Sequence, residues 1–268
     1  MTTAPLLRPA STVLLLREES QGFSVFMVQR NRRLAFMPRA WVFPGGRVDA
    51  ADALREHPRV VGGELALTAM GLPPDEGVAF LVAAARETLE ESGVWLGSGE
   101  PSAALRDALN ARECTLAEGL DAEDLRLDLD VLRPWSWWVT PEAEPRRYDT
   151  RFFVAVVTGQ AGRHDDGETV NSAWMPIGEA VRAAEAGELP MAPPTWWTLR
   201  ELNAHSTADR ALKARRSRRP ICPILRGEMS DLTLVLPGHD EHSEPPIEGL
   251  PTEVRFSQGR WWAAPTSD

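Results

Sequence analysis

Three carboxylates stand close together in the first half of the sequence, at a spacing typical of one helix face. Glu87, Glu90 and Glu91 occupy positions i, i+3 and i+4, so on a helix they project within about 5–6 Å of each other. Carboxylates this close repel, and an oxygen-binding cation such as Mg²⁺ or Mn²⁺ removes the repulsion. Arg86 lies four residues before Glu90, where it is placed to orient that carboxylate. The spacing by itself is typical of a solvated acidic helix face, and a metal site for phosphate chemistry is the alternative that the surrounding residues must support.

The residues around the carboxylates have the periodicity of a helix. Over 78–92, apolar residues recur at helical spacing on the side away from the glutamates. Gly93 follows, and glycine commonly ends a helix because it takes the left-handed conformation without strain. We therefore predict a helix over 78–92 that presents the three glutamates on one side.

Strands are predicted before and after this helix. The segments 11–16 and 23–29 predict a β-hairpin, and a short strand at 41–43 runs into Pro44-Gly45-Gly46, where glycines permit a close approach of ligand to backbone. Further strands are predicted at 135–140, 151–158 and 169–175, and further helices at 177–186 and 195–204. Trp135 and Trp137 alternate within a strand, which favours core packing on one shared face over stacking on a ligand.

The glycine loop and the acidic helix together resemble the signature of the Nudix hydrolase family. In that family a glycine loop precedes the string Arg-Glu-aliphatic-x-Glu-Glu-x-Gly-aliphatic, and residues 86–94 here are Arg-Glu-Thr-Leu-Glu-Glu-Ser-Gly-Val. Asp52 stands where the family has a glutamate six residues after the glycine. Gly46 and Arg86 are 40 positions apart, so an insertion of about 26 residues interrupts the signature.

The interruption is similar to that of one branch of the family. The chain resembles the peroxisomal acyl-coenzyme A diphosphatases and their bacterial relatives in three features. These are Trp-Val-Phe-Pro-Gly-Gly-Arg-Val-Asp at 41–49, the insertion, and the acidic string at 84–94. The segments 138–141, 146–153 and 193–195 are similar to the same branch. The resemblance runs from about residue 8 to about residue 205.

The resemblance implies a fold and a division of the chain. The expected fold is of the α/β class, an α/β/α sandwich with a mixed sheet. A Nudix domain is expected at 8–205, with insertions at about 52–77 and about 98–132, and a C-terminal extension at 206–268.

The resemblance also implies roles for individual residues. The metal, Mg²⁺ or Mn²⁺, is expected on Glu87, Glu90, Glu91 and the carbonyl of Gly46. Catalytic roles are expected for Glu91, Glu90, Arg86 and Glu168. Glu168 matches a later carboxylate that many family members use as an extra ligand or base, and an ordinary acidic loop residue is the alternative.

Evidence about the substrate comes from a partial motif. Members that cleave coenzyme A carry an arginine ahead of Phe-Pro-Gly-Gly, and Arg30 precedes 43–46 at the matching spacing. Arg39 replaces a glycine of that motif, and Ala35 replaces an arginine. Arginines just before the glycine loop are placed to bind phosphates; a solvated basic loop is the alternative, and it is favoured less for Arg30 than for the others. Substrate binding is therefore expected at Arg30, Arg39, Phe43, Gly45 and Gly46.

These features predict a metal-dependent diphosphate hydrolase. Coenzyme A or acyl-coenzyme A is the leading substrate, cleaved to 3′,5′-ADP and (acyl-)phosphopantetheine. A nucleotide sugar or a dinucleotide is the alternative substrate, because the fold does not determine it. A ligand-binding module without activity is the alternative of another class, and the three retained glutamates with Arg86 favour the enzyme.

Composition excludes other classes of protein. The chain has 268 residues, 43% of them hydrophobic, which is typical of a globular protein. Its 29 basic and 39 acidic residues leave a net charge of −10, which argues against a nucleic-acid partner. No apolar run approaches the ~18–20 residues that span a bilayer, so we expect a cytoplasmic protein with no membrane partner. A small diphosphate is the expected ligand, and the resemblance implies a homodimer.

Overall fold

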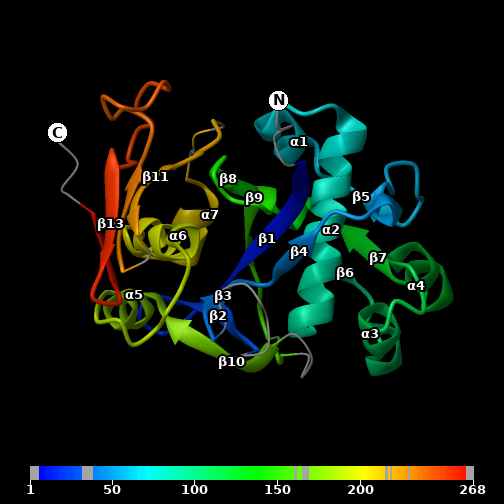
Figure 1. Ribbon diagram of the computed structural model, residues 1–268. Helices are drawn as coiled ribbons and strands as arrows, with labels where there is room; N and C mark the ends of the chain where they lie inside the picture. The colour runs from blue at the N-terminus through cyan, green and yellow to red at the C-terminus, as the bar shows by residue number, and fades with distance from the viewer. Residues whose placement is uncertain are drawn as a thin grey trace.

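The computed structural model describes residues 6–31, 39–159, 162–164, 169–214, 217, 219–228 and 230–263. Its centre is a mixed sheet in the order β10-β2-β1-β9-β8, with β3 paired to β2 and β4 to β1 (Figure 1). Two of these strands, β1 (Leu7–Glu18) and β9 (Arg147–Val156), are parallel, and the other strand pairs of this sheet are antiparallel. The other strands of this sheet are β2 (Phe23–Arg30), β3 (Trp41–Val42), β4 (Gly45–Arg47), β8 (Arg133–Val139) and β10 (Thr169–Pro176).

Helices cover both faces of the central sheet. Along β1, Val13 and Leu15 point to the core beneath α2 (Pro74–Ser92), while Leu14 and Leu16 point to the core beneath α5 (Ile177–Glu185) and α6 (Pro193–Asn203). A strand buried on both faces is continuously apolar, which explains the apolar residues at 13–16. The helices of both faces confirm the expected α/β/α sandwich with a mixed sheet.

Helix α2 is buried on nearly all sides. The structure confirms a helix that ends at Gly93, whose φ is 70°. The helix begins at Pro74 rather than at Val78 as predicted, because a proline is well suited to the first helical position. Besides the predicted apolar side, Phe80, Ala84 and Arg86 are buried as well.

The two segments expected as insertions fold together around α2. A 3-10 helix η1 (Ala50–Asp52) leads into the first, which contains β5 (Val60–Val61) and α1 (Glu64–Met70). The second contains α3 (Ala103–Asn110), α4 (Leu116–Ala122), β7 (Arg126–Asp128) and a 3-10 helix η2 (Leu129–Val131). Together with β6 (Gly97–Ser98), β5 and β7 form a small sheet in the order β5-β7-β6. Leucines of α3 and α4 join the core of α2, among them Leu105 and Leu120.

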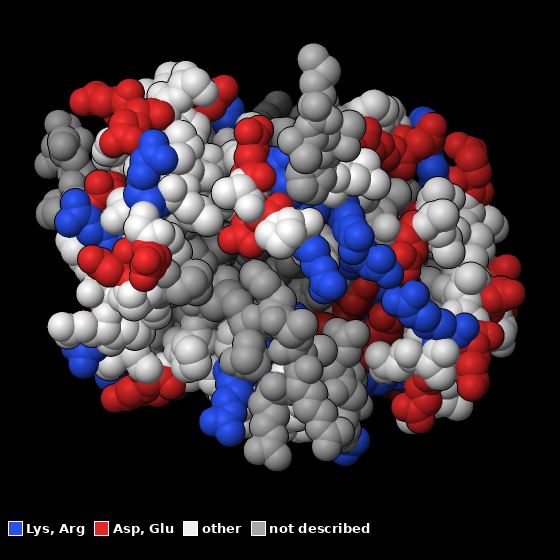
Figure 2. All heavy atoms as spheres, viewed as in Figure 1, with Lys and Arg blue, Asp and Glu red and all other residues white. Residues whose placement is uncertain are grey.

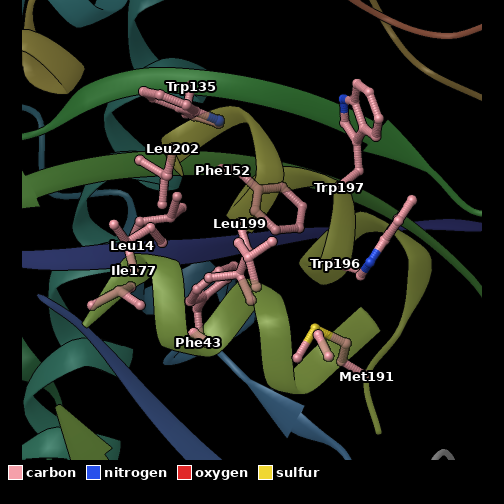
Figure 3. Packing of buried hydrophobic residues seen from close by; sticks show 14 of the residues in the cluster. Leu14, Phe43, Trp135, Phe152, Ile177, Met191, Trp196, Trp197, Leu199 and Leu202 are labelled. Carbon is pink, nitrogen blue, oxygen red and sulfur yellow. The ribbon is translucent and has the colours of Figure 1, made fainter. Parts of the chain in front are cut away.

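The C-terminal residues form a further layer. After α7 (Ala208–Leu212), a four-stranded antiparallel sheet contains β11 (Ile224–Glu228), β12 (Asp231–Val235), β13 (Glu253–Ser257) and β14 (Arg260–Ala263). Leu232, Leu234 and Trp261 from this sheet share a core with α5 and α6. Figure 3 shows part of that core, with Trp196 and Leu199 from α6.

The expectation that Trp135 and Trp137 share one strand face is wrong. The register of β8 against β9 shifts between Pro134 and Ser136, and such an irregularity reverses the faces that follow it. Trp135 packs in the core beneath α6, whereas the ring of Trp137 lies 3.5 Å from the guanidinium carbon of Arg151 on the α2 side.

Within the described part of the chain, no single helix is long and apolar enough to cross a membrane. Among the described helices, the pair α1 and α2 taken together reaches the required length and composition, and the two are bent by 113°.

Candidate active site

Arg86 is the centre of the polar cluster on α2. Arg86 is 8% exposed. Its Nε and Nη2 donate to the two carboxylate oxygens of Asp52 at 2.8 and 3.0 Å. Nη2 also donates to the carbonyl of Arg47 at 2.9 Å. Burial lowers the pKa of Arg86, but the hydrogen bonds to Asp52 and the charges of Glu87, Asp52 and Glu90 outweigh it, so the pKa is raised overall. Arg86 is a cation fixed in place by carboxylates from two segments.

Asp52 connects the two parts of the signature that the insertion separates in sequence. Its side chain is 1% exposed and reaches Arg86 from η1, 34 residues earlier in the chain. Its second oxygen also accepts from the backbone N–H of Asp49 at 2.8 Å. Asp52 was not among the predicted site residues, although its place six residues after Gly46 was the available signal.

Glu87 and Glu90 surround the remaining nitrogen of Arg86. Nη1 donates to Glu87 at 2.9 Å and to both oxygens of Glu90 at 3.2 Å. Burial raises the pKa of Glu87 to about 7 against the lowering effect of Arg86, and burial raises the pKa of Glu90 in the same way. Asp52, Glu87 and Glu90 thus place three carboxylates around one guanidinium group. When all three are ionised, the cluster carries an excess of negative charge, which a divalent cation would neutralise.

The glycine loop lies directly against these carboxylates. A Cβ atom at Gly46 would collide with the carboxylate of Glu87, and one at Gly45 would collide with the carbonyl oxygen of Ser11 and with Thr12. The loop is held by a hydrogen bond from Val13 N–H to the Pro44 carbonyl at 2.8 Å. The backbone contact with Ser11 therefore requires glycine at position 45, whereas a side chain at position 46 would displace the Glu87 carboxylate.

Glu91 points to the glycine loop and not to Arg86. Its Oε2 accepts from the backbone N–H of Gly45 at 2.9 Å. In the described residues, no three acidic, histidine or cysteine side chains converge closely enough to hold a metal ion. The donor chemistry nevertheless fits Mg²⁺ or Mn²⁺, since Glu87, Glu90 and Gly46 offer only oxygen atoms and Glu87 is buried with a raised pKa. The ligand roles of these residues stay predictions.

The residues predicted to bind substrate are placed in three different environments. Gln29, Asn31, Arg39 and Val170 line a cavity of about 450 Å³. Arg30 lies between two of these in β2, and strand alternation directs its side chain to the α2 face. Its buried Nε has no hydrogen-bond partner among the described residues. Of the two predicted arginines, therefore, Arg39 alone lines this cavity.

Phe43 and Glu168 differ from their predicted placement in other ways. Phe43 is 3% exposed and lies in the core with Ile177 and Leu199, as Figure 3 shows. Phe43 therefore fixes the start of the glycine loop to the core, and its side chain does not face the solvent where a substrate was expected. Glu168 lies outside the described residues, and its role stays a prediction.

Comparison with known proteins identifies the family. The family model described as the NUDT19 Nudix domain matches residues 66–202, just over half of the chain. The chain belongs to the Nudix hydrolase family. This membership makes it a pyrophosphohydrolase, an enzyme that cleaves phosphoric anhydride bonds.

Relatives of this Nudix hydrolase include proteins named acyl-coenzyme A diphosphatase NUDT19. The chicken (Gallus gallus) protein of that name is 29% identical over 84% of this chain and 74% of its own length. The human (Homo sapiens) protein of that name is 29% identical over 71% of this chain and 63% of its own length.

A solved Nudix structure has the same fold. The crystal structure of a Nudix hydrolase from Alicyclobacillus acidocaldarius aligns with a TM-score of 0.70 and 29% sequence identity. The alignment covers 78% of this chain and 97% of that one. The two proteins thus share a fold over most of this chain.

Proposed function

We propose that this Nudix hydrolase cleaves the diphosphate of coenzyme A or acyl-coenzyme A, with Mg²⁺ or Mn²⁺, to 3′,5′-ADP and (acyl-)phosphopantetheine. The observation that carries the proposal is the carboxylate cluster around Arg86, which the fold assembles against Gly46 despite the insertion. The similarity to proteins named acyl-coenzyme A diphosphatase supports the choice of substrate.

The reaction is the addition of water to one phosphorus atom of the diphosphate. The oxygen of water forms the new P–O bond, and the bridging P–O bond breaks, so that the bridging oxygen leaves on the other phosphate. A bound divalent cation would neutralise the diphosphate and acidify water. Glu87, Glu90, Glu91 and the Gly46 carbonyl are the proposed ligands, and Arg86 orients Glu87 and Glu90 through Nη1.

Two features support an anionic substrate. On the face seen in Figure 2, basic side chains cross the region in front of β4 and α2, and acidic side chains lie just below them. Arg39, which lines the 450 Å³ cavity, has a φ of 63°. That conformation costs a residue other than glycine about 1–2 kcal/mol, and strain of this kind often marks a functional position. We assign Arg39 to the 3′-phosphate of coenzyme A.

The conformation of Arg39 also accounts for one departure from the coenzyme A motif. The motif has a glycine at this position, and a left-handed φ is the conformation that glycine takes without strain. Here the carbonyl of Arg39 accepts from Nε2 of Gln29 at 3.2 Å. The backbone shape of the motif is therefore kept, and a positive side chain is added.

Product analysis tests the proposal directly. The protein is incubated with Mg²⁺ or Mn²⁺ and, separately, with coenzyme A, acetyl- and long-chain acyl-coenzyme A, NADH, ADP-ribose and a nucleotide sugar. We expect 3′,5′-ADP from the coenzyme A compounds, and we expect EDTA and the Glu91→Gln variant to abolish its release. Cleavage of another compound alone would replace the substrate, and cleavage of none would favour a ligand-binding module.

A further inference from the structure

The last turn of α2 carries Glu90 and Glu91, and we propose that Arg106 is a positioning residue that holds this turn in place. Arg106 belongs to α3, in the second insertion, and lies outside the Nudix signature. The proposal rests on the proposed function for the importance of the two glutamates. The contacts of Arg106 themselves are independent of it.

Arg106 connects two separate segments through one guanidinium group. Its Nε donates to the carbonyl of Glu90 at 3.0 Å, and its Nη2 donates to the carbonyl of Arg163 at 2.7 Å. The N–H of Arg163 in turn donates to the carbonyl of Ser92 at 2.7 Å. Asn110, one turn further along α3, adds a bond to the Glu90 carbonyl at 3.2 Å. The end of α2, the loop at 162–164 and α3 are thereby joined.

These bonds satisfy carbonyl groups that a helix leaves open. The last four carbonyls of an α-helix have no partner within it. At the end of α2, the N–H of Gly93 donates to the carbonyl of Leu89 at 2.8 Å. The carbonyl of Glu90 accepts from side chains of α3, and the carbonyl of Ser92 accepts from the loop at 162–164. A cation at this end is also favoured by the helix dipole. The turn with the two glutamates is therefore held by residues far away in sequence.

The geometry of the guanidinium explains why an arginine stands here. Its planar fork offers several donors in fixed directions, so one side chain reaches two carbonyls at once; a lysine offers one charged atom. Gly93 leaves the necessary space, since a Cβ atom there would lie 3.2 Å from Nη1 of Arg106. Without Arg106 we expect the last turn to open more often, and the carboxylates of Glu90 and Glu91 to lose their fixed positions.

Hydrogen exchange on the metal-free protein tests this role without reference to any substrate. The amides of Gly93 and Arg163 report on the end of α2 and on the loop. In Arg106→Ala we expect their exchange to accelerate about tenfold or more, as the loss of a charge-assisted hydrogen bond implies. Arg106→Lys should recover part of the protection. Asp107→Ala, on the exposed side of α3, is the matched control and should leave both amides unchanged.

Calorimetric titration with Mn²⁺ gives the second readout. We expect Arg106→Ala to lower the affinity about tenfold, the scale found for residues that orient metal ligands, and Asp107→Ala to retain it. Unchanged exchange at both amides would overturn the proposal, as would acceleration spread evenly over the central sheet, which would indicate a general loss of stability. If the unaltered protein binds no Mn²⁺, the proposed function fails, and the exchange result still decides whether Arg106 holds the turn.

Discussion

Asp52→Asn tests whether the interrupted signature is joined through the Arg86–Asp52 pair. Asparagine keeps the shape of the side chain but replaces one oxygen with an NH₂ group. That group would face an N–H donor, because the two oxygens of Asp52 accept from Arg86 Nε, Arg86 Nη2 and Asp49 N–H. The change therefore removes one charge and leaves at least one donor without an acceptor.

The expected loss of stability follows from the burial of the pair. Breaking a buried ion pair costs about 3–5 kcal/mol when the remaining charge has no partner. Arg86 retains Glu87 and Glu90 on Nη1, so we expect the lower end, about 3 kcal/mol. For a chain of this size that corresponds to a fall in Tm of about 6–12 °C.

Urea unfolding with and without Mn²⁺ measures this loss, with the fluorescence of the ten tryptophans as the signal. Asp49→Asn is the matched control, because Asp49 is 42% exposed and its carboxylate lies 3.9 Å from Arg86; we expect a loss below about 1 kcal/mol there. Equal losses in the two variants would refute the reasoning, since Asp52 would then be no more than a surface charge.

Three further predictions concern the glycine loop and its neighbours. Gly46→Ala forces the Glu87 carboxylate to move, so we expect the rate of diphosphate cleavage to fall about 100-fold, with a loss of about 1–2 kcal/mol in urea unfolding. Arg39→Gly relieves the strain of the left-handed backbone but adds conformational freedom to the unfolded chain, so Tm should change by less than about 3 °C. The loss of the guanidinium should raise KM for coenzyme A about tenfold. An unchanged KM would remove Arg39 from the substrate site. In the metal-free protein, Glu87 has a pKa of about 7 when folded against an ordinary 4.5. The folded state then holds a proton that the unfolded state releases, so Glu87 lowers stability as pH rises from 4.5 to 7, by roughly 3 kcal/mol in all. Glu87→Gln should remove this decrease, because glutamine does not ionise. Urea unfolding at pH 8 in EDTA measures the effect, and a variant less stable than the unaltered protein would contradict the prediction.

The sequence alone was sufficient for features that depend on neighbouring residues. The helix that ends at Gly93 and the pairing of Arg86 with Glu90 follow from a spacing of a few residues, and the structure confirms both. The hairpin of β1 and β2 is confirmed for the same reason. Alternation and helical periodicity are set within one element, so they can be counted directly from the residues.

Tertiary structure alone decided which distant residues meet. It brought Asp52 to Arg86 across 34 positions, placed Arg106 on the carbonyl of Glu90, and buried Phe43 in the core. The irregularity in β8 that separates Trp135 from Trp137 likewise depends on the register with β9. Such contacts result from the simultaneous packing of several elements and leave no periodic pattern in the chain. The sequence therefore specified the acidic helix, while the packing of the insertions and strands around it decided how its carboxylates are held.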